Sequence, residues 1–167
     1  MNAILFGATG MVGSGVLQAC LEDPRVQAVL VVGRSPCAVV HPKVQEQLHA
    51  DFFDYAAIQA RWASYDVCFF CLGVSSALPF KAAYMFRPGY IQLLKGVRSK
   101  TRLYQAIYDV LGPLYPLLRL MPRWVTSSSA IGQAMIRVAA EGYSSPILES
   151  LGINRVSEGT RALGGTS

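Results

Sequence analysis

The sequence predicts an α/β fold built on a doubly wound parallel sheet with helices on both faces. The first half of the chain carries this prediction, because apolar strand-like segments alternate with helical patterns. The strand-like segments are residues 2–6, 28–32, 44–49 and 66–72, and the helical patterns are residues 12–21 and 55–62. The segment 28–32 is a continuous apolar run, as a strand covered on both faces requires.

Most elements in the first half end at a recognisable stop signal. The helix over residues 12–21 has apolar residues at helical spacing and ends ahead of Pro24. Gly33 and Pro36 break the second strand, and Gly73 closes the fourth. The third strand, residues 44–49, is the weakest of the four because its apolar pattern is the least continuous.

The middle of the chain is less regular. Residues 82–86 are strand-like and stop at Arg87-Pro88-Gly89. Two helical patterns follow, over residues 101–111 and 114–120, and prolines interrupt them. We therefore expect a strand and a pair of short helices in this region.

The C-terminal region predicts one long helix and a short strand. Ser127–Ser129 offer an N-cap for a helix over residues 130–141, and Gly142 follows at the usual C-cap position. Residues 146–149 predict a last strand. The remaining segment is polar and contains glycine, which is typical of a flexible end.

Length and composition indicate one globular domain. We place it over residues 1–150 of the 167, ahead of a flexible tail over residues 151–167. Hydrophobic residues make up 52% and charged residues 15%, which excludes a disordered chain. The net charge of +5 comes without a run of Lys or Arg, so we expect no nucleic-acid partner. No signal peptide or apolar run of transmembrane length is seen, which predicts a cytoplasmic location.

The cysteines and histidines do not predict a metal or redox site. We expect all four cysteines to be reduced core residues: Cys20, Cys37, Cys68 and Cys71. Cys68 and Cys71 have C-x-x-C spacing, but residues three apart on a strand point to opposite faces. His41 and His49 have no acidic or cysteine partner at ligand spacing, so we expect both at the surface.

The most informative motif joins the first strand to the first helix and reads Gly-Ala-Thr-Gly-Met-Val-Gly. A dinucleotide pyrophosphate requires this spacing: Gly7 permits a tight turn, Gly10 lets backbone amides approach the phosphates, and Gly13 lets helix and strand pack closely. The same glycines also fit a merely structural turn, but the strand before and the helix after favour cofactor binding. The predicted contact residues are Gly7, Thr9, Gly10, Met11, Val12 and Gly13.

The end of the second strand decides which dinucleotide is favoured. A site for NAD(H) needs a carboxylate there for the ribose 2′-hydroxyl, whereas NADP(H) needs a cation for the 2′-phosphate. Here Arg34 and Ser35 follow Gly33 without an acid. Their donors suit a phosphate, and the alternative for Arg34 is a solvated surface side chain. We therefore expect NADP(H) to be favoured over NAD(H).

Two further segments are expected beside the cofactor. Asp51 follows the third strand, where it can accept a hydrogen bond from the adenine amino group while Phe52 or Phe53 lines the ring. The alternative for Asp51 is a helix N-cap, a role that Asp54 suits better. The fourth strand ends at the carboxyl edge of the sheet, where ligands bind. The predicted contact residues there are Leu72, Gly73 and Val74.

These motifs together resemble the atypical short-chain dehydrogenase/reductase superfamily, and the closest subgroup is the Tat-interacting-protein-like, NAD(P)-binding epimerase/dehydratase type. Besides the glycine motif, the resemblance rests on Val31-Val32-Gly33-Arg34, Ala50-Asp51-Phe52, Cys71-Leu72-Gly73 and Phe86-Arg87-Pro88-Gly89. It implies a Rossmann sheet with the cofactor over the residues named above. It also implies that Arg87-Pro88-Gly89 lies beside the nicotinamide.

The chain departs from this family in its centre. Redox members carry a Ser or Thr and then Tyr-x-x-x-Lys, and no tyrosine here has a lysine four positions later. The resemblance passes directly across Ala77-Leu78, which implies either an internal deletion that truncates the fold or residues absent from this sequence. The connection over residues 73–81 is shorter than the dozen residues of a usual crossover. Tyr84 and Tyr90 fall near the expected nicotinamide end, but neither has a lysine in register.

Two kinds of function follow from the sequence. The first is an oxidoreductase-like NADP(H)-binding protein, which without the Tyr-x-x-x-Lys pair is expected to lack turnover. The second is a non-catalytic dinucleotide-binding regulator or a peripheral membrane protein, because the apolar segment 103–125 with its flanking basic residues suits an interfacial helix. The alternative for that segment is a helix pair over the substrate side. An uncovered sheet edge at the deletion would favour association, including with a second copy.

Overall fold

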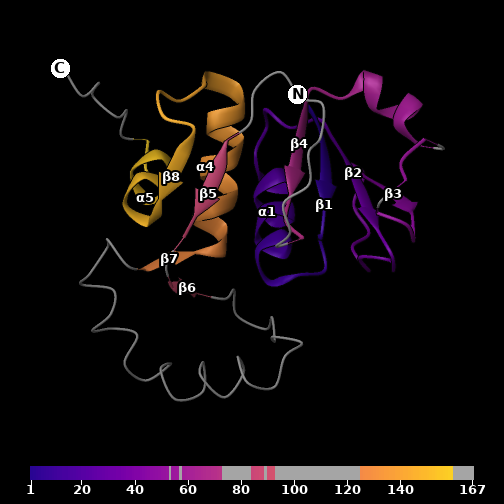
Figure 1. Cartoon of the computed structure of the whole chain (residues 1–167), viewed down its shortest axis with the longest axis horizontal. Helices are drawn as coiled ribbons and strands as arrows, with labels where there is room; N and C mark the ends of the chain where they lie inside the picture. Colours follow the sequence, from indigo (N-terminus) through magenta and orange to yellow (C-terminus); the bar gives the residue numbers. More distant parts are fainter. Residues whose placement is uncertain (53, 57, 73–83, 89, 93–124, 160–167) are drawn as a thin grey trace, which may run out of the picture.

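A parallel four-stranded sheet forms the first half of the molecule, as seen in a computed structural model that describes residues 1–52, 54–56, 58–72, 84–88, 90–92 and 125–159. Its strands are β1 (Asn2–Phe6), β2 (Ala28–Gly33), β3 (Val44–Leu48) and β4 (Val67–Phe70). They lie in the order β3-β2-β1-β4 (Figure 1). All the pairs are parallel, and Phe6 of β1 stands in register with Val32 of β2 and Phe70 of β4.

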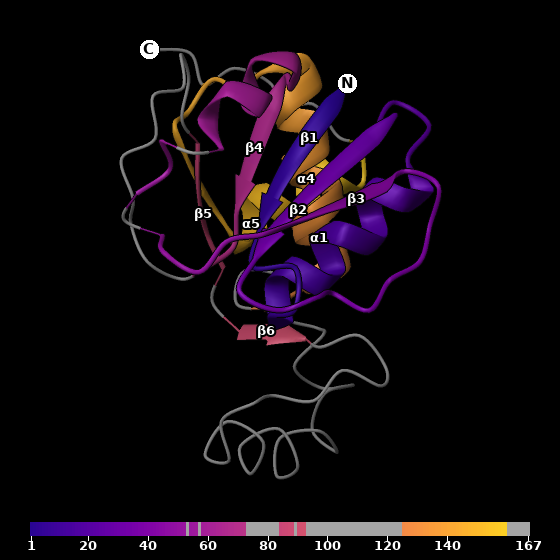
Figure 2. The ribbon, with the colours of Figure 1, turned by 90° about the vertical axis from the view of Figure 1, so that its right-hand side faces the viewer.

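Apolar residues cover both faces of this sheet, as the continuous apolar runs predict. Helix α1 (Met11–Glu22) packs on one face, where Leu5, Val16 and Val31 belong to one buried cluster. A short 3₁₀ helix, η1 (Gln59–Ser64), and the aromatic residues before it lie on the other face, around Phe6. Figure 2 shows the sheet in front of α1.

The second half of the molecule is built around helix α4 (Ser128–Glu141), which packs against α1. Two short parallel pairs accompany it. One joins β5 (Met85–Arg87) to β8 (Ile147–Glu149), and the other joins β6 (Tyr90–Gln92) to β7 (Val125–Ser127). Helix α5 (Ser150–Ser157) follows β8 and packs on α4 through a second core that includes Ile131, Leu148 and Ile153.

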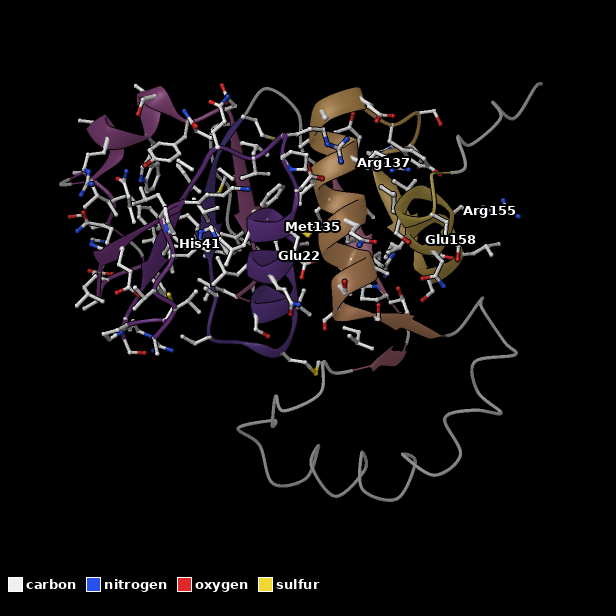
Figure 3. All side chains as sticks on the ribbon, turned by 180° about the vertical axis from the view of Figure 1, so that it is seen from behind. Glu22, His41, Met135, Arg137, Arg155 and Glu158 are labelled. Atoms are coloured by element: carbon white, nitrogen blue, oxygen red, sulfur yellow. The ribbon has the colours of Figure 1, made fainter. Side chains whose placement is uncertain are left out.

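Helices α1 and α4 run side by side in the same direction (Figure 3). Gly15 near the start of α1 lies against Ser128 at the start of α4, whereas Arg25 beyond the end of α1 pairs with Glu141 at the end of α4, at 3.5 Å. Each helix begins directly after a strand, so both N-termini lie at the edge of the molecule where the strands end. This carboxyl edge is where an open α/β sheet binds ligands.

The helix ends use several kinds of cap. The Ser127 hydroxyl accepts a hydrogen bond from the Ala130 amide at 3.0 Å, as predicted, and Gly142 ends α4 with a φ of +74°. Lys43 holds the other end of α1, because its Nζ donates to the Leu21 and Asp23 carbonyl oxygens at 2.9 Å each. A cation at this position complements the partial negative charge of the helix C-terminus.

The structure corrects several predicted elements. The helix expected over residues 55–62 is instead the 3₁₀ helix η1, and β6 was not predicted. The flexible tail expected over residues 151–167 is wrong for its first part. Residues 150–157 form α5, because Ile153 and Val156 are buried against α4.

Other expectations fall on residues outside the described part of the chain. They are the junction at Ala77-Leu78, the helical patterns over residues 101–111 and 114–120, and nearly all of the apolar segment 103–125. Among the helices that the structure describes, none is both long and apolar enough to cross a bilayer.

Candidate functional site

The turn between β1 and α1 is built on glycines, each for a different steric reason. Gly7 has a φ of +77°, a conformation that side chains disfavour, and it lies against the end of β4. A Cβ atom at Gly7 would be 2.7 Å from the Cys71 carbonyl oxygen and 3.2 Å from the Leu72 side chain. The first glycine therefore brings β1, its turn and the end of β4 together.

Gly13 and Gly10 differ in what surrounds them. A Cβ atom at Gly13 would lie only 2.0 Å from the Gly7 carbonyl oxygen, so this residue lets α1 pack directly on the turn. A Cβ atom at Gly10 would be less restricted: the one described atom near it would be that same oxygen, at 3.2 Å. Among the described residues, the Gly10 position is therefore the more open of the two.

The first turn of α1 is suited to an anion. Gly10 is its N-cap residue and supplies no side-chain cap, and the turn holds no acidic side chain. The partial positive charge of the helix N-terminus is therefore not offset by a carboxylate of its own turn. Thr9 is exposed beside it, and Met11 and Val12 are half-buried.

Arg34 follows β2 at the same edge and is exposed, as is Ser35. Its guanidinium carbon lies 5.9 Å from the centre of the Phe52 ring, within the range of a cation–π contact. Both ion pairs found in the described part of the chain involve Arg25, with Asp23 and with Glu141. Arg34 therefore keeps its charge without a carboxylate partner among those residues.

An acid on the neighbouring strand escaped the sequence prediction. Glu46 on β3 stands in register with Val31, and its Oε1 accepts a hydrogen bond from the Cys37 amide at 2.6 Å. Hydrogen bonds from Cys37 hold the pKa of Glu46 below its usual value. This carboxylate fixes the loop that follows Arg34, and only the folded loop reveals that pairing.

The segment after β3 forms an aromatic group. Phe52 stands edge-on to the buried Phe6, at 6.1 Å between ring centres, and His49 stacks on Tyr55 at 5.6 Å. His49 Nε2 is 2.6 Å from the Asp54 carbonyl oxygen. His49, expected at the surface, lies there half-buried and held by these neighbours.

The two acids of this segment differ in their roles. The Asp54 carboxylate accepts a hydrogen bond from the Ala56 amide at 2.9 Å, so it stabilises the turn rather than the first turn of η1. Asp51 is exposed and lies just before Phe52. Its expected role beside the adenine stays a prediction.

The end of β4 is described only in part. Leu72 lies next to Gly7, as predicted for a residue at the carboxyl edge. Gly73 and Val74, predicted with it, lie outside the described residues. Cys68 on β4 packs on the face of Phe6, whereas Cys71, which directly follows β4, packs on the face of α1, so the C-x-x-C pair points to opposite faces as predicted.

All four cysteines are free thiols, and Cys20 is buried whereas Cys37, Cys68 and Cys71 are partly buried. Burial raises the pKa of Cys20, Cys68 and Cys71 to about 12, so these thiols stay protonated at neutral pH. No group of His, Cys, Asp and Glu in the described ranges has the arrangement of a metal site.

Tyr84 does not lie at the expected nicotinamide end. It precedes β5, at the edge opposite the glycine turn, and its hydroxyl accepts a hydrogen bond from the Tyr143 amide at 3.3 Å. Arg87 and Pro88, at the other end of β5, lie at the carboxyl edge instead. Gly89 and the side chain of Tyr90 fall outside the described part.

Comparison with known proteins supports the fold. No family profile and no curated protein matches the chain in sequence. Two crystal structures of the Bordetella bronchiseptica enzyme WbmF are similar, one in complex with NAD+ and one with NAD+ and UDP. The two structures have TM-scores of 0.54 and 0.55 and sequence identities of 13% and 16% to this chain, respectively. The matches cover 95% and 99% of this chain, and each covers 78% of the WbmF chain. The chain therefore has a Rossmann-like α/β fold, with a parallel central sheet and flanking helices.

Proposed function

We propose that the protein binds a nicotinamide dinucleotide at the carboxyl edge of the sheet, with the pyrophosphate over the Gly7–Gly13 turn. The contrast between two glycines carries this proposal. Gly13 is needed for packing, because a Cβ atom there would strike the turn at 2.0 Å. At Gly10 the restriction is milder, because the nearest described atom to a Cβ there would be the Gly7 carbonyl oxygen at 3.2 Å, and Gly10 stands at the N-terminus of α1, where a phosphate would be stabilised.

The proposal includes a preference for NADP(H) over NAD(H). Arg34 at the end of β2 offers a fork of donors that suits a phosphate, and no described carboxylate neutralises it. Glu46, the acid on the adjacent strand, is engaged by the Cys37 amide. The WbmF structures contain NAD+, so the preference proposed for this chain rests on its own residues.

We further propose that the chain is a member of the short-chain dehydrogenase/reductase superfamily without turnover of carbonyl or alcohol substrates. Hydride transfer to a carbonyl needs a positioned acid, which contributes roughly 10²–10⁴-fold of rate. The sequence lacks the Tyr-x-x-x-Lys pair. The Tyr84 hydroxyl is engaged with the Tyr143 amide at the far edge.

Calorimetric titration of NADPH and NADH against the wild type and Gly10→Val tests the binding site. The variant is expected to lose measurable binding of both, because a branched side chain would occupy the place proposed for the pyrophosphate, and the melting temperature shows whether the turn accommodates its 3.2 Å contact with the Gly7 carbonyl oxygen. Gly152→Ala is the control, since its Cβ would lie at ordinary distances in α5. Retained affinity in Gly10→Val, with an unchanged melting temperature, would show that the glycines form only a structural turn.

A further inference from the structure

The Phe52 ring connects the exposed Arg34 to the buried core of the sheet. Arg34 is exposed, and a long charged side chain at the surface would ordinarily sample many rotamers. Its guanidinium instead lies over the Phe52 ring, 5.9 Å from the ring centre. An aromatic face attracts a cation in this geometry, so the contact limits where the charge can lie.

Phe52 is itself fixed by other rings. It stands edge-on to Phe6, which is fully buried on β1, and its ring centre is 6.3 Å from that of His49. Phe6 in turn contacts Trp62 at 5.9 Å and Phe70 at 5.2 Å. The position of the Phe52 ring is therefore set by the core of the sheet rather than by the surface loop.

We propose that Phe52 is a positioning residue for cofactor selectivity: it holds the Arg34 guanidinium at the end of β2, ready for the ribose 2′-phosphate of NADP(H). This inference rests on the proposed function. A group ordered before binding loses less conformational entropy when the ligand arrives, which strengthens only the interaction that uses it. Phe52 should therefore affect NADPH and leave NADH, which has no 2′-phosphate, unchanged.

A purely structural role for Phe52 gives a different result. If the ring only packed against Phe6, or only lined the adenine, its loss would weaken both cofactors alike. The ratio of the NADPH and NADH dissociation constants distinguishes the positioning role from a purely structural one. Effects on folding and on adenine binding change both constants equally, so they cancel in the ratio. Phe70 offers a matched control, because it contacts the same Phe6 ring from β4. In the described part of the chain, the cation–π contact of Arg34 is with Phe52 and not with Phe70.

The experiment is a double-mutant cycle with calorimetric titration of both cofactors. Phe52→Leu is expected to lower the preference for NADPH about two- to fivefold, the size of an exposed cation–π contact. Phe52→Tyr, which keeps an aromatic face, should restore the wild-type ratio, and Phe70→Leu should leave it unchanged. In an Arg34→Ala background, Phe52→Leu should produce no further change in the ratio, because the partner is already absent.

The outcomes separate this inference from the proposed function. An unchanged ratio in Phe52→Leu, or an equal loss in the Arg34→Ala background, would overturn the positioning role while leaving cofactor binding in place. A wild type that binds both cofactors equally and ignores Arg34→Ala would instead overturn the proposed selectivity. If Phe52→Leu unfolds, Phe52→Met decides, since it keeps an apolar side chain of similar length without the aromatic face: a lowered ratio would support the positioning role and an unchanged ratio would overturn it.

Discussion

Gly132 of α4 lies so close to Gly15 of α1 that a Cβ atom on Gly132 would be 3.0 Å from the Gly15 carbonyl oxygen. The same atom would also lie 2.8 Å from the Ala19 methyl carbon. Gly15 is equally restricted, because its own Cβ would lie 2.6 Å from the Ser128 backbone. This glycine contact joins the two halves of the molecule and aligns the N-termini of both helices.

We predict that Gly132→Ala lowers the free energy of unfolding by about 1–3 kcal/mol, because an extra methyl group overpacks the contact between the helices. The measurement is urea denaturation followed by circular dichroism. Gly152→Ala in α5 is the matched control, where the gain in helix propensity of up to about 1 kcal/mol is not opposed by a clash. Equal changes in the free energy of unfolding for Gly132→Ala and Gly152→Ala would mean that α1 and α4 accommodate the extra methyl group without loss of stability.

We predict that Arg34→Ala weakens NADPH binding about 10- to 100-fold and leaves NADH binding unchanged. A hydrogen bond to a charged group contributes about 1.5–3 kcal/mol, and only NADPH carries the 2′-phosphate. Arg155→Ala, an exposed arginine on α5, is the control for general charge effects. Parallel losses for both cofactors, or none for either, would place the guanidinium away from the phosphate.

We predict that the protein does not oxidise NADPH with aldehydes, ketones or quinones, because the acid required for proton delivery is missing from the expected register. The assay follows the absorbance of the reduced nicotinamide. If turnover is found, Tyr84→Phe and Tyr90→Phe identify its source. Loss of turnover in Tyr90→Phe would identify Tyr90 as a replacement acid. Loss of turnover in Tyr84→Phe would contradict the position of Tyr84 at the edge opposite the glycine turn.

We predict that the fold loses stability between about pH 9 and pH 12. The pKa of the Cys20, Cys68 and Cys71 thiols is raised from 9.0 to about 12 by burial. The unfolded chain then releases these protons at a lower pH than the folded chain, so rising pH favours unfolding. Urea denaturation at about pH 7 and about pH 10 measures the loss.

Cys68→Ala tests the origin of that dependence. The variant should be less stable at neutral pH, because it leaves a small cavity beside the Phe6 face. Its further loss on raising the pH should be smaller than that of the wild type, because one buried proton is gone. An identical dependence in both proteins would assign the alkaline sensitivity to other groups.

The sheet and its turn could be predicted from the sequence, whereas the second half largely could not. The strands β1, β2 and β4 are apolar local patterns that end at clear signals, so their existence depends little on distant contacts, whereas β3 has the weakest local pattern of the four. Helix α5 has a polar surface and becomes helical because Ile153 and Val156 pack on α4. Its burial is a tertiary effect that no local pattern reveals.

The candidate site divides in the same way. The glycine spacing and the position of Arg34 follow from the motif and the end of β2. The contact of Arg34 with Phe52 and the pairing of Glu46 with Cys37 depend on how two loops fold beside each other. A glycine inside a helix, as at Gly15 and Gly132, is a weak sequence indication of close packing. The reason for the two glycines becomes clear only from the contact between α1 and α4.

The pairing of α1 with α4 also constrains the order in which the protein can be made. Helix α1 emerges from the ribosome more than a hundred residues before Ile136 of α4, which completes the core against Val16 and Ala19. A nascent chain that has reached only β4 would expose that apolar surface to other proteins. Molecular chaperones are therefore expected to bind this part of the chain until α4 has been synthesised.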